Sequence, residues 1–290
     1  MPPILTQGPD PSPRPPRFRC PPGTTDTHIH LFGPADRYPF DPSTYYISAD
    51  ALPETNIALQ DTLGISRAVI ISGGGYGRNT LHLADTLARF PDRYRGVALV
   101  PDEIASAEIG RLDKLGVRGV RFMSGSRGGV LPTISETLAA RVAEHGWHVQ
   151  FYPHGADIAD FADRLLALPN TIVLDHFASV SAGKGVDQPA MKTLFRMLDT
   201  GRVWIKLSGP MRCMPGDFPY AAVTPLARAL VAHAPERLVW GTDWPHVNMD
   251  GRGMPNDGDL VDLIPEWITD AGDRQRILVD NPCSLYGFER

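Results

Sequence analysis

The sequence predicts a single (β/α)8 (TIM) barrel over residues 23–290, preceded by a proline-rich extended arm over residues 1–22. The first observation is an alternation. Eight short apolar or β-branched runs recur over about 250 residues, and a helix-like segment follows each run. The second is that these runs are apolar throughout, as expected of parallel strands covered on both faces. The third is the presence of nine prolines among the first 22 residues, which removes amide donors and opposes both helix and sheet.

The predicted strands and helices alternate along the chain. The expected strands are Thr24–His30, Arg67–Gly73, Arg95–Val100, Val117–Phe122, Trp147–Tyr152, Thr171–Phe177, Val203–Leu207 and Leu238–Asp243. The expected helices are Asn56–Leu63, Thr80–Phe90, Ala105–Leu115, Ile134–His145, Ile158–Leu168, Pro189–Leu198, Val223–Ala234 and Leu260–Ala271. Pro225 supports one of these helices, because proline is well suited to a first helical turn.

A doubly wound parallel sheet is the rival fold. Such sheets usually have fewer strands and carry a G-x-G-x-x-G phosphate turn after the first strand. The glycine-rich segment here, residues 73–77, follows the second strand and does not fit that spacing. The barrel is therefore the preferred interpretation.

Composition narrows the classes of function. The chain has 28 Lys and Arg against 33 Asp and Glu, a net charge of −5, whereas binders of nucleic acid or anionic membranes carry a basic excess. No apolar run is long enough for a membrane-spanning helix, and the N-terminus lacks the apolar core of a secretory signal. Cys20, Cys213 and Cys283 are odd in number and widely spaced, which opposes a disulfide framework. We therefore expect a cytosolic protein with a small-molecule partner.

Polar side chains gather where three of the predicted strands end. The first strand ends with His28 and His30, which alternation places on the same side. The sixth ends near His176, and the eighth ends at Asp243. In a (β/α)8 barrel the C-terminal strand ends meet at one mouth, which predicts that these four residues share a site.

These strand-end residues resemble the amidohydrolase superfamily (amidohydrolase family 2). The likeness lies in the His-x-His pair, the sixth-strand histidine and the eighth-strand aspartate, and in the phrases TDTHIHLFGP, LDHF, WIKLSG and GTDWPHVN. Within the superfamily the chain is most similar to a branch that acts on lactones. That branch contains 2-pyrone-4,6-dicarboxylate hydrolase, 4-sulfomuconolactone hydrolase and galactarolactone isomerase. The resemblance implies a lactonase, a hydrolase that acts on a carboxylic ester.

The resemblance also raises the question of a metal. Many amidohydrolases bind zinc through the first-strand pair, a fifth-strand histidine and the eighth-strand aspartate. Here the fifth strand ends at Tyr152, and His154 lies beyond the expected position, a departure that matches the metal-independent pyrone hydrolase. We therefore expect no cofactor. The alternative is a single divalent metal such as zinc, held by His28, His30 and Asp243 with either His154 or His176.

Arginines near the expected mouth predict an anionic substrate, because a guanidinium binds a carboxylate through two parallel hydrogen bonds. Arg121 ends the fourth strand, Arg127 lies in the glycine-rich loop that follows it, and Arg212 follows the seventh strand. They also look like the carboxylate-binding arginines of the pyrone hydrolase. Residues 124–132 contain no Asp or Glu, so we expect these arginines to lack acidic partners. Further candidates for substrate binding are Tyr152, Tyr46 or its neighbour Tyr45, Ser72 and Asn248.

The expected reaction is hydrolysis of a small carboxylated lactone. The best candidate is 2-pyrone-4,6-dicarboxylate, opened to an oxalomesaconate-type acid. Asp243 would be the general base for water, and His28, His30 and His176 would stabilise the oxyanion. One alternative in the same fold is a sugar-diacid lactone isomerase, with His176 or His154 as a second proton-transfer group. Another, of a different class, is a non-catalytic barrel that binds a dicarboxylate.

Overall fold

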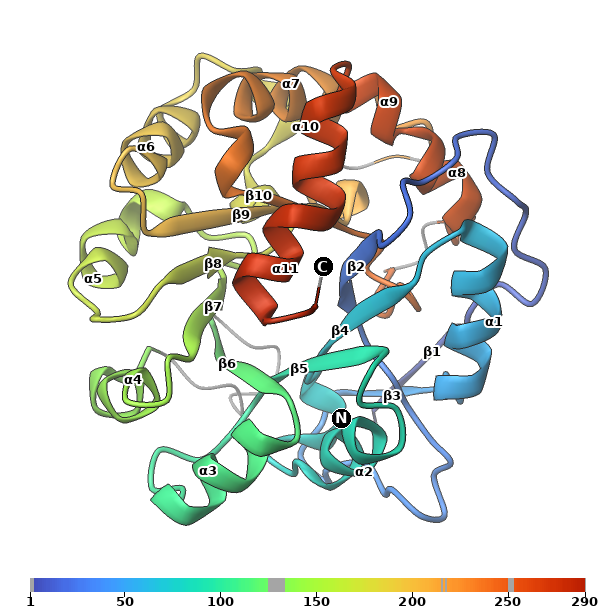
Figure 1. The fold of residues 1–290 in the computed structure, drawn as a ribbon, viewed down its shortest axis with the longest axis vertical. Helices are drawn as coiled ribbons and strands as arrows, with labels where there is room; N and C mark the ends of the chain where they lie inside the picture. Colours follow the sequence, from blue (N-terminus) through green and yellow to red (C-terminus); the bar gives the residue numbers. More distant parts are fainter. Residues whose placement is uncertain (1–2, 125–133, 215, 217, 250–252, 290) are drawn as a thin grey trace.

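Eight parallel strands form the predicted barrel around a common centre (Figure 1). The computed structural model describes residues 3–124, 134–214, 216, 218–249 and 253–289. The barrel strands pair in chain order: β2 (Thr25–Ile29), β4 (Arg67–Ile71), β5 (Tyr94–Ala98), β6 (Val117–Met123), β7 (His148–Tyr152), β8 (Ile172–Leu174), β9 (Val203–Ser208) and β10 (Leu238–Gly241). The barrel closes between the last and the first of them. The amide of Asp243 donates to the carbonyl of His28 (2.9 Å), and the amide of His30 donates to the carbonyl of Trp244 (2.7 Å).

Helices surround the strands on the outside of the barrel. They are α1 (Pro53–Leu63), α2 (Leu81–Arg89), α3 (Ser106–Lys114), α4 (Glu136–Ala143), α5 (Ala162–Leu166), α6 (Pro189–Leu198), α7 (Thr224–His233), α8 (Asp257–Asp262) and α9 (Ile264–Trp267). The last two lie where one helix was expected, because Pro265 has no amide hydrogen with which to continue α8. Over the described residues, no helix combines the length and the apolar character that crossing a bilayer requires.

The C-terminal segment forms helices that the sequence did not predict. The α-helix α10 (Ala271–Gln275), one π-helical turn (Arg276–Asp280) and α11 (Asn281–Tyr286) follow one another without a break. Figure 1 shows α11 across the centre of the barrel, near the C-terminus. Tyr286 and Leu278 are fully buried there. Pro282 lies at the junction between the π-helical turn and α11, where the change of helix type accommodates its missing amide hydrogen.

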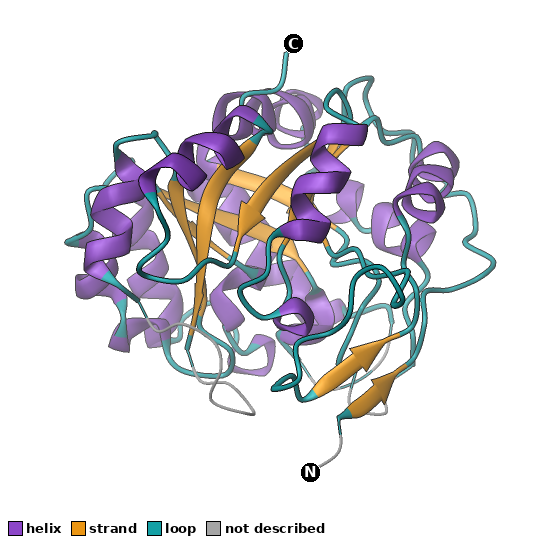
Figure 2. Cartoon of the chain, turned by 90° about the horizontal axis from the view of Figure 1, so that it is seen from below, coloured by secondary structure: helices purple, strands orange, loops and turns teal. Residues whose placement is uncertain are grey.

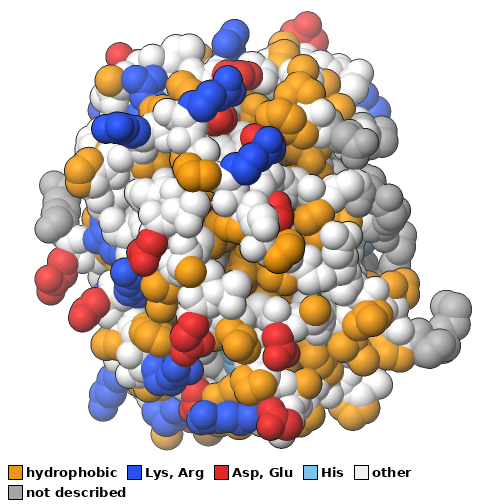
Figure 3. Space-filling view, turned by 90° about the vertical axis from the view of Figure 1, so that its right-hand side faces the viewer, with side chains coloured by type: hydrophobic (Ala, Val, Ile, Leu, Met, Phe, Trp, Pro, Cys, Tyr) orange, Lys and Arg blue, Asp and Glu red, His pale blue; other side chains and the backbone are white. Residues whose placement is uncertain are grey.

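The N-terminal residues run along one side of the barrel. Ile4–Thr6 form strand β1, which pairs in parallel with β3 (Tyr46–Ser48). The prediction did not include this strand, which lies in a stretch between prolines where amide donors are available. Further on, the carboxylate of Asp262 in α8 accepts hydrogen bonds from the amides of Arg17 and Phe18 (both 2.8 Å). Figure 2 shows β1 and β3 side by side, and Figure 3 shows charges of both signs scattered over one side of the molecule.

His148, the first residue of β7, is a polar residue buried inside the fold. Its ring packs directly against Gly119, where a Cβ atom would lie 2.5 Å from Nε2, and edge-on to Tyr286. Nε2 is buried and has no hydrogen-bond partner within the described structure. Burial, with the nearby charge of Lys206, lowers the pKa of His148 to about 3. The residue is therefore neutral in the folded protein at physiological pH.

This burial predicts an acid-sensitive fold. In the unfolded chain His148 binds a proton below about pH 6.5, whereas in the folded chain it does so only near pH 3. The free energy of unfolding therefore falls as the pH falls from about 6.5 to about 3. Replacing His148 by Gln should remove about 1 kcal/mol per pH unit from the slope of the unfolding free energy between pH 6 and pH 4. Urea unfolding at each pH measures this slope. Substitution of the half-buried His145 by Gln is the control, and parallel curves for wild type and His148→Gln would show that His148 does not titrate on unfolding.

Candidate active site

A cavity opens at the C-terminal ends of the strands, where (β/α)8 barrels bind their ligands. Its volume is about 250 Å³, below the range of about 300–1,000 Å³ typical of pockets for drug-sized ligands. It therefore suits a small molecule. The residues that line it are His30, Tyr45, Tyr46, Gly73, Gly74, Arg121, Met123, Tyr152, His154, Gly155, His176, Arg212, Asp243, Val247 and Asn248.

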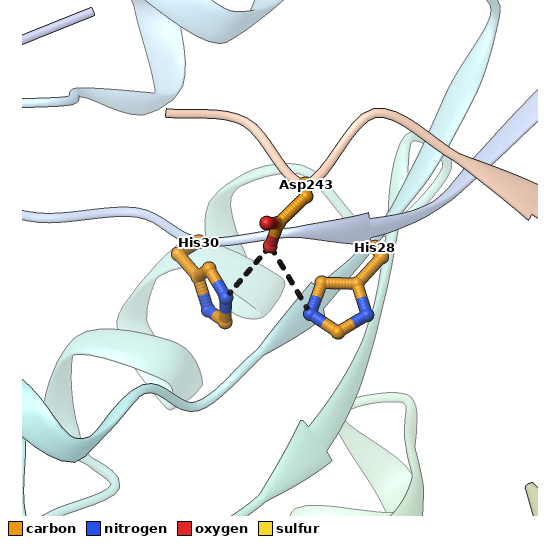
Figure 4. A group of neighbouring side chains, drawn as sticks. All are labelled: His28, His30 and Asp243. Atoms are coloured by element: carbon orange, nitrogen blue, oxygen red, sulfur yellow. Dashed lines mark ion pairs between the residues drawn. The ribbon is translucent and has the colours of Figure 1, made fainter. Parts of the chain in front are cut away.

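Three imidazole rings surround one carboxylate oxygen beside this cavity. Oδ1 of Asp243 lies 3.7 Å from Nε2 of His28, 3.6 Å from Nε2 of His30 and 3.6 Å from Nε2 of His176. Figure 4 shows the first two rings turned toward the carboxylate. All four side chains are almost completely buried. The structure thus brings together the four residues that the sequence placed at the strand ends.

Unusual backbone conformations aim two of these side chains. Asp243 and His176 have φ angles of 72° and 51°, in the left-handed region that costs most residues about 1–2 kcal/mol. Gly209, which follows β9, also has a positive φ, and a Cβ atom there would lie 2.7 Å from Nδ1 of His176. The fold therefore tolerates strain and requires a glycine in order to place these rings.

Hydrogen bonds fix how two of the imidazoles are protonated. Nδ1 of His30 lies 2.7 Å from the carbonyl oxygen of Ile71, and Nδ1 of His28 lies 3.2 Å from Oδ1 of Asp175. The carbonyl oxygen of Ile71 can only accept, so Nδ1 of His30 carries a proton. Nδ1 of His28 lies nearer to the carboxylate, which accepts, than to Nζ of Lys206 at 3.5 Å, which donates, and this places the proton of His28 on Nδ1 and its lone pair on Nε2, toward Asp243. His176 is different, because its Nδ1 lies 3.0 Å from the hydroxyl of Ser208, which can donate or accept.

A layer of buried charges lies behind the histidines. Oδ2 of Asp175 accepts hydrogen bonds from Nε and Nη2 of Arg121 (3.2 and 3.0 Å) and from Nε2 of Gln150 (3.1 Å). Nζ of Lys206 lies 3.5 Å from Oδ1 of Asp175 and 3.5 Å from Nδ1 of His28. Lys206 also donates to the carbonyl of Thr27 (2.8 Å) and to Oε1 of Gln150 (2.9 Å). Strands β2, β6, β7 and β9 and the residue after β8 thus meet in one network.

Burial and neighbouring charges shift the pKa values of these groups. Burial alone would raise the pKa of Asp243, but the Arg212 guanidinium and the histidines outweigh it and hold that pKa well below its usual value. Asp175 is held low in the same way by His28, Lys206 and Arg121. Burial lowers the pKa of His176 to about 4. At neutral pH the cluster therefore combines an ionised Asp243 with a neutral His176.

Two of the predicted arginines are described, and both have acidic partners. Arg121 pairs with Asp175. Arg212 donates through Nε to Oδ2 of Asp243 (2.9 Å), and its Nη2 lies 2.9 Å from the same oxygen. The expectation that Arg121 and Arg212 lack acidic partners is therefore wrong. Their partners lie at the ends of strands that are distant in sequence. Arg212 is also held by the carbonyls of Val247 and Asn248. Arg127 lies outside the described residues.

The remaining predicted residues divide into two groups. Tyr152, Tyr46 and Asn248 line the cavity, as does His154, and the side-chain amide of Asn248 donates to the hydroxyl of Tyr45 (3.1 Å). The hydroxyl of Tyr46 accepts a hydrogen bond from the amide of Gly75 (3.1 Å). Ser72 is not among the described lining residues, and its carbonyl accepts a hydrogen bond from Arg121 instead.

Sequence reasoning assigned no role to Asp175, Gln150 or Lys206. Asp175 directly precedes His176, and Lys206 lies within the WIKLSG phrase. Both are therefore charged residues within predicted strands that are otherwise apolar. A charged residue inside an apolar strand needs a partner, which was the available signal. The identity of each partner depends on contacts between distant strands, which a single sequence does not show.

The site contains residues that could hold a metal ion. Two groups have ligand atoms close enough together: His28, His30 and Asp243, and His28, Asp175 and His176. His154 belongs to neither group in the described part of the chain. The 3.6–3.7 Å spacings around Oδ1 of Asp243 are close to the separation of about 3.4 Å for ligands about 2.1 Å from a tetrahedral zinc ion. Nδ1–H donation to a carbonyl or carboxylate is also usual for metal-binding histidines. The donor set therefore fits one divalent cation.

Comparisons with known proteins agree with this geometry. Residues 25–288 match the family model described as amidohydrolase. The chain is 37% identical over 286 residues to 2-pyrone-4,6-dicarboxylate hydrolase of Comamonas testosteroni, covering 95% of this chain and 93% of that protein. It is 36% identical over 284 residues to 4-sulfomuconolactone hydrolase of Hydrogenophaga intermedia, covering 97% and 94%. An apo crystal structure from Agrobacterium tumefaciens superposes with a TM-score of 0.85 at 30% identity, covering 94% of this chain and 99% of that one.

Proposed function

This chain belongs to the amidohydrolase family, and we propose that it hydrolyses a small carboxylated lactone, with 2-pyrone-4,6-dicarboxylate the best candidate. The observation that carries the proposal is the ionised Asp243 among three imidazoles, beside two arginines, in a cavity of about 250 Å³. A base, oxyanion donors and carboxylate-binding groups in one small site are the parts that opening a carboxylated lactone requires. Two lactone hydrolases among the relatives support the same reaction. The three free cysteines support a cytosolic location.

Asp243 is placed to act as the general base. Arg212 holds Oδ2, so Oδ1 is the oxygen that can accept a proton from water. The water oxygen bonds to the lactone carbonyl carbon as its proton moves to Oδ1. Collapse of the tetrahedral intermediate then breaks the ring C–O bond, and the proton returns to the ring oxygen that leaves. His176 can donate from Nε2 to the oxyanion when the hydroxyl of Ser208 donates to its Nδ1.

The arginines are placed to bind substrate carboxylates while paired. In the described structure Arg121 uses three of its five N–H groups, two on Asp175 and one on the carbonyl of Ser72. The N–H groups that remain on Nη1 and Nη2 can bind one carboxylate with two parallel hydrogen bonds. Arg212 is held by Asp243, so a carboxylate beside it lies close to the base. The substrate would thus be oriented by the same residues that hold the catalytic carboxylate.

A metal fits the donors of this site, but the surrounding charge opposes it. His28, His30 and Asp243 would hold a divalent cation, which when bound would polarise the lactone carbonyl and acidify water. Arg121 and Arg212 pair with Asp175 and Asp243, and Lys206 adds a positive charge in excess of these two pairs, 3.5 Å from Nδ1 of His28. Two further positive charges would have to be desolvated beside that excess. We therefore propose that the reaction needs no metal.

The role of Asp243 predicts a specific kinetic defect. Asp243→Asn should lower kcat by about 10²–10⁴-fold, the usual contribution of a general base, with little change in KM. Steady-state kinetics on 2-pyrone-4,6-dicarboxylate measure both constants, and Asp259→Asn on the surface helix α8 is the control. A kcat like that of wild type in Asp243→Asn would exclude the aspartate as base.

The arginines predict selectivity for substrate charge. Converting one carboxylate of the lactone to its methyl ester should lower kcat/KM by roughly 30- to 1,000-fold, because each lost bidentate contact costs about 2–4 kcal/mol. The kcat/KM for the dicarboxylate should also fall as the ionic strength is raised from low to physiological values. Equal rates on diacid and monoester, or migration of the ring ester observed by NMR without ring opening, would point to a different substrate or to isomerisation.

The charge of the site predicts that activity survives chelation. Protein purified without added metal should contain well under one equivalent of zinc, and dialysis against a chelator should leave kcat unchanged. Elemental analysis before and after dialysis measures the metal content directly. Stoichiometric zinc whose removal abolishes turnover, and whose return restores it, would contradict this prediction.

A further inference from the structure

We propose that Lys206 is a built-in cation: its buried ammonium group supplies the positive charge that a divalent metal would bring to this site, and so keeps divalent cations from binding there. The inference concerns a residue that the reaction described above does not use directly. The prediction about metal binding depends only on the geometry around Lys206. The prediction about substrate affinity rests on the proposed function.

The first support is where Lys206 lies. Its side chain is completely buried inside the barrel, and Nζ contacts the far side of the ring whose Nε2 faces Asp243. The Nζ–Nδ1 distance to His28 is 3.5 Å, so only the imidazole separates the ammonium group from the place where a metal would bind. Two neutral acceptors, the carbonyl of Thr27 and the amide oxygen of Gln150, hold the group in position.

The second support is the balance of buried charge. Asp175 and Arg121 form one pair, and Asp243 and Arg212 form another. Lys206 is the cation in excess, because the carboxylate that it approaches, at 3.5 Å, is already paired with Arg121. Another buried acid in this region, Asp26, accepts hydrogen bonds from the amide of His28 and from Thr242, and within the described structure it forms no ion pair with Lys206.

The third support is that the donor atoms are otherwise suitable for a metal. Nε2 of His28 and Nε2 of His30 both face Oδ1 of Asp243, with spacings close to those around zinc. A site with suitable ligands and an adjacent fixed cation should bind a dication weakly, because the repulsion acts in a medium of low polarity. Removing that one charge should therefore make the site bind metal.

The test compares zinc binding by metal-free wild type with two variants that remove the excess charge in different ways. Lys206→Met deletes the cation, and Gln150→Glu keeps Lys206 but places a carboxylate against it. We expect each variant to bind one equivalent of Zn²⁺ at least tenfold more tightly than wild type in competition with a coloured chelator. Co²⁺ should give a tetrahedral visible spectrum in the variants at concentrations where wild type shows none. Lys192→Met, at an exposed position on α6, is the control and should match wild type.

Circular dichroism and thermal unfolding identify which variants are folded, and either folded variant decides the outcome. Zinc affinity unchanged in a folded variant would overturn the proposal, as would tight stoichiometric zinc in wild type. In the same variants KM for the dicarboxylate lactone should rise at least tenfold. If no lactone is turned over by wild type, the proposed function fails while the zinc comparison still decides the role of Lys206.

Discussion

One buried carboxylate, that of Asp175, holds the site together. One of its oxygens accepts from Arg121 and Gln150, and the other faces His28 and Lys206. Burying an ionised carboxylate is unfavourable unless it is well paired, and here it has two cations, an amide and an imidazole around it. Because its partners come from β2, β6, β7 and β9, the carboxylate couples the packing of these four strands to the orientation of the ring that faces Asp243.

The same network of buried charges determines the electrostatic potential in the cavity. Each described arginine at the mouth is paired with an acid, so the attraction for an anion does not come from unpaired guanidinium groups on the surface. We propose that it comes from the buried ammonium group of Lys206, which neither arginine pair neutralises, and from the N–H groups left on Arg121. A chain with a net charge of −5 can therefore present a positive interior to a dicarboxylate. The pairing also keeps Asp243 ionised, which a base that accepts a proton from water requires.

Much of the fold followed from local pattern, because buried parallel strands and amphipathic helices leave a periodic record in the sequence. The strand ends also pointed to His28, His30, His176 and Asp243, since barrel topology brings such ends together. What could not be predicted depends on contacts across the barrel. The acidic partners of Arg121 and Arg212, and the place of Lys206, are set by residues far away in sequence. The segment Ala271–Tyr286 was missed because Pro282 falls inside it, and proline opposes a helix interior unless the helix changes type there, as it does after the π-helical turn.

The most direct measurement of this account is the protonation state of the His28 ring. Nitrogen-15 NMR of protein labelled on histidine, with His28→Gln used for assignment, distinguishes the two neutral tautomers from the charged ring. If Asp175 orients the ring as described, His28 remains neutral from pH 6 to pH 8 with its proton on Nδ1, as the strongly lowered pKa of this buried group also requires. A proton on Nε2, or a doubly protonated ring in that range, would contradict the role of Asp175.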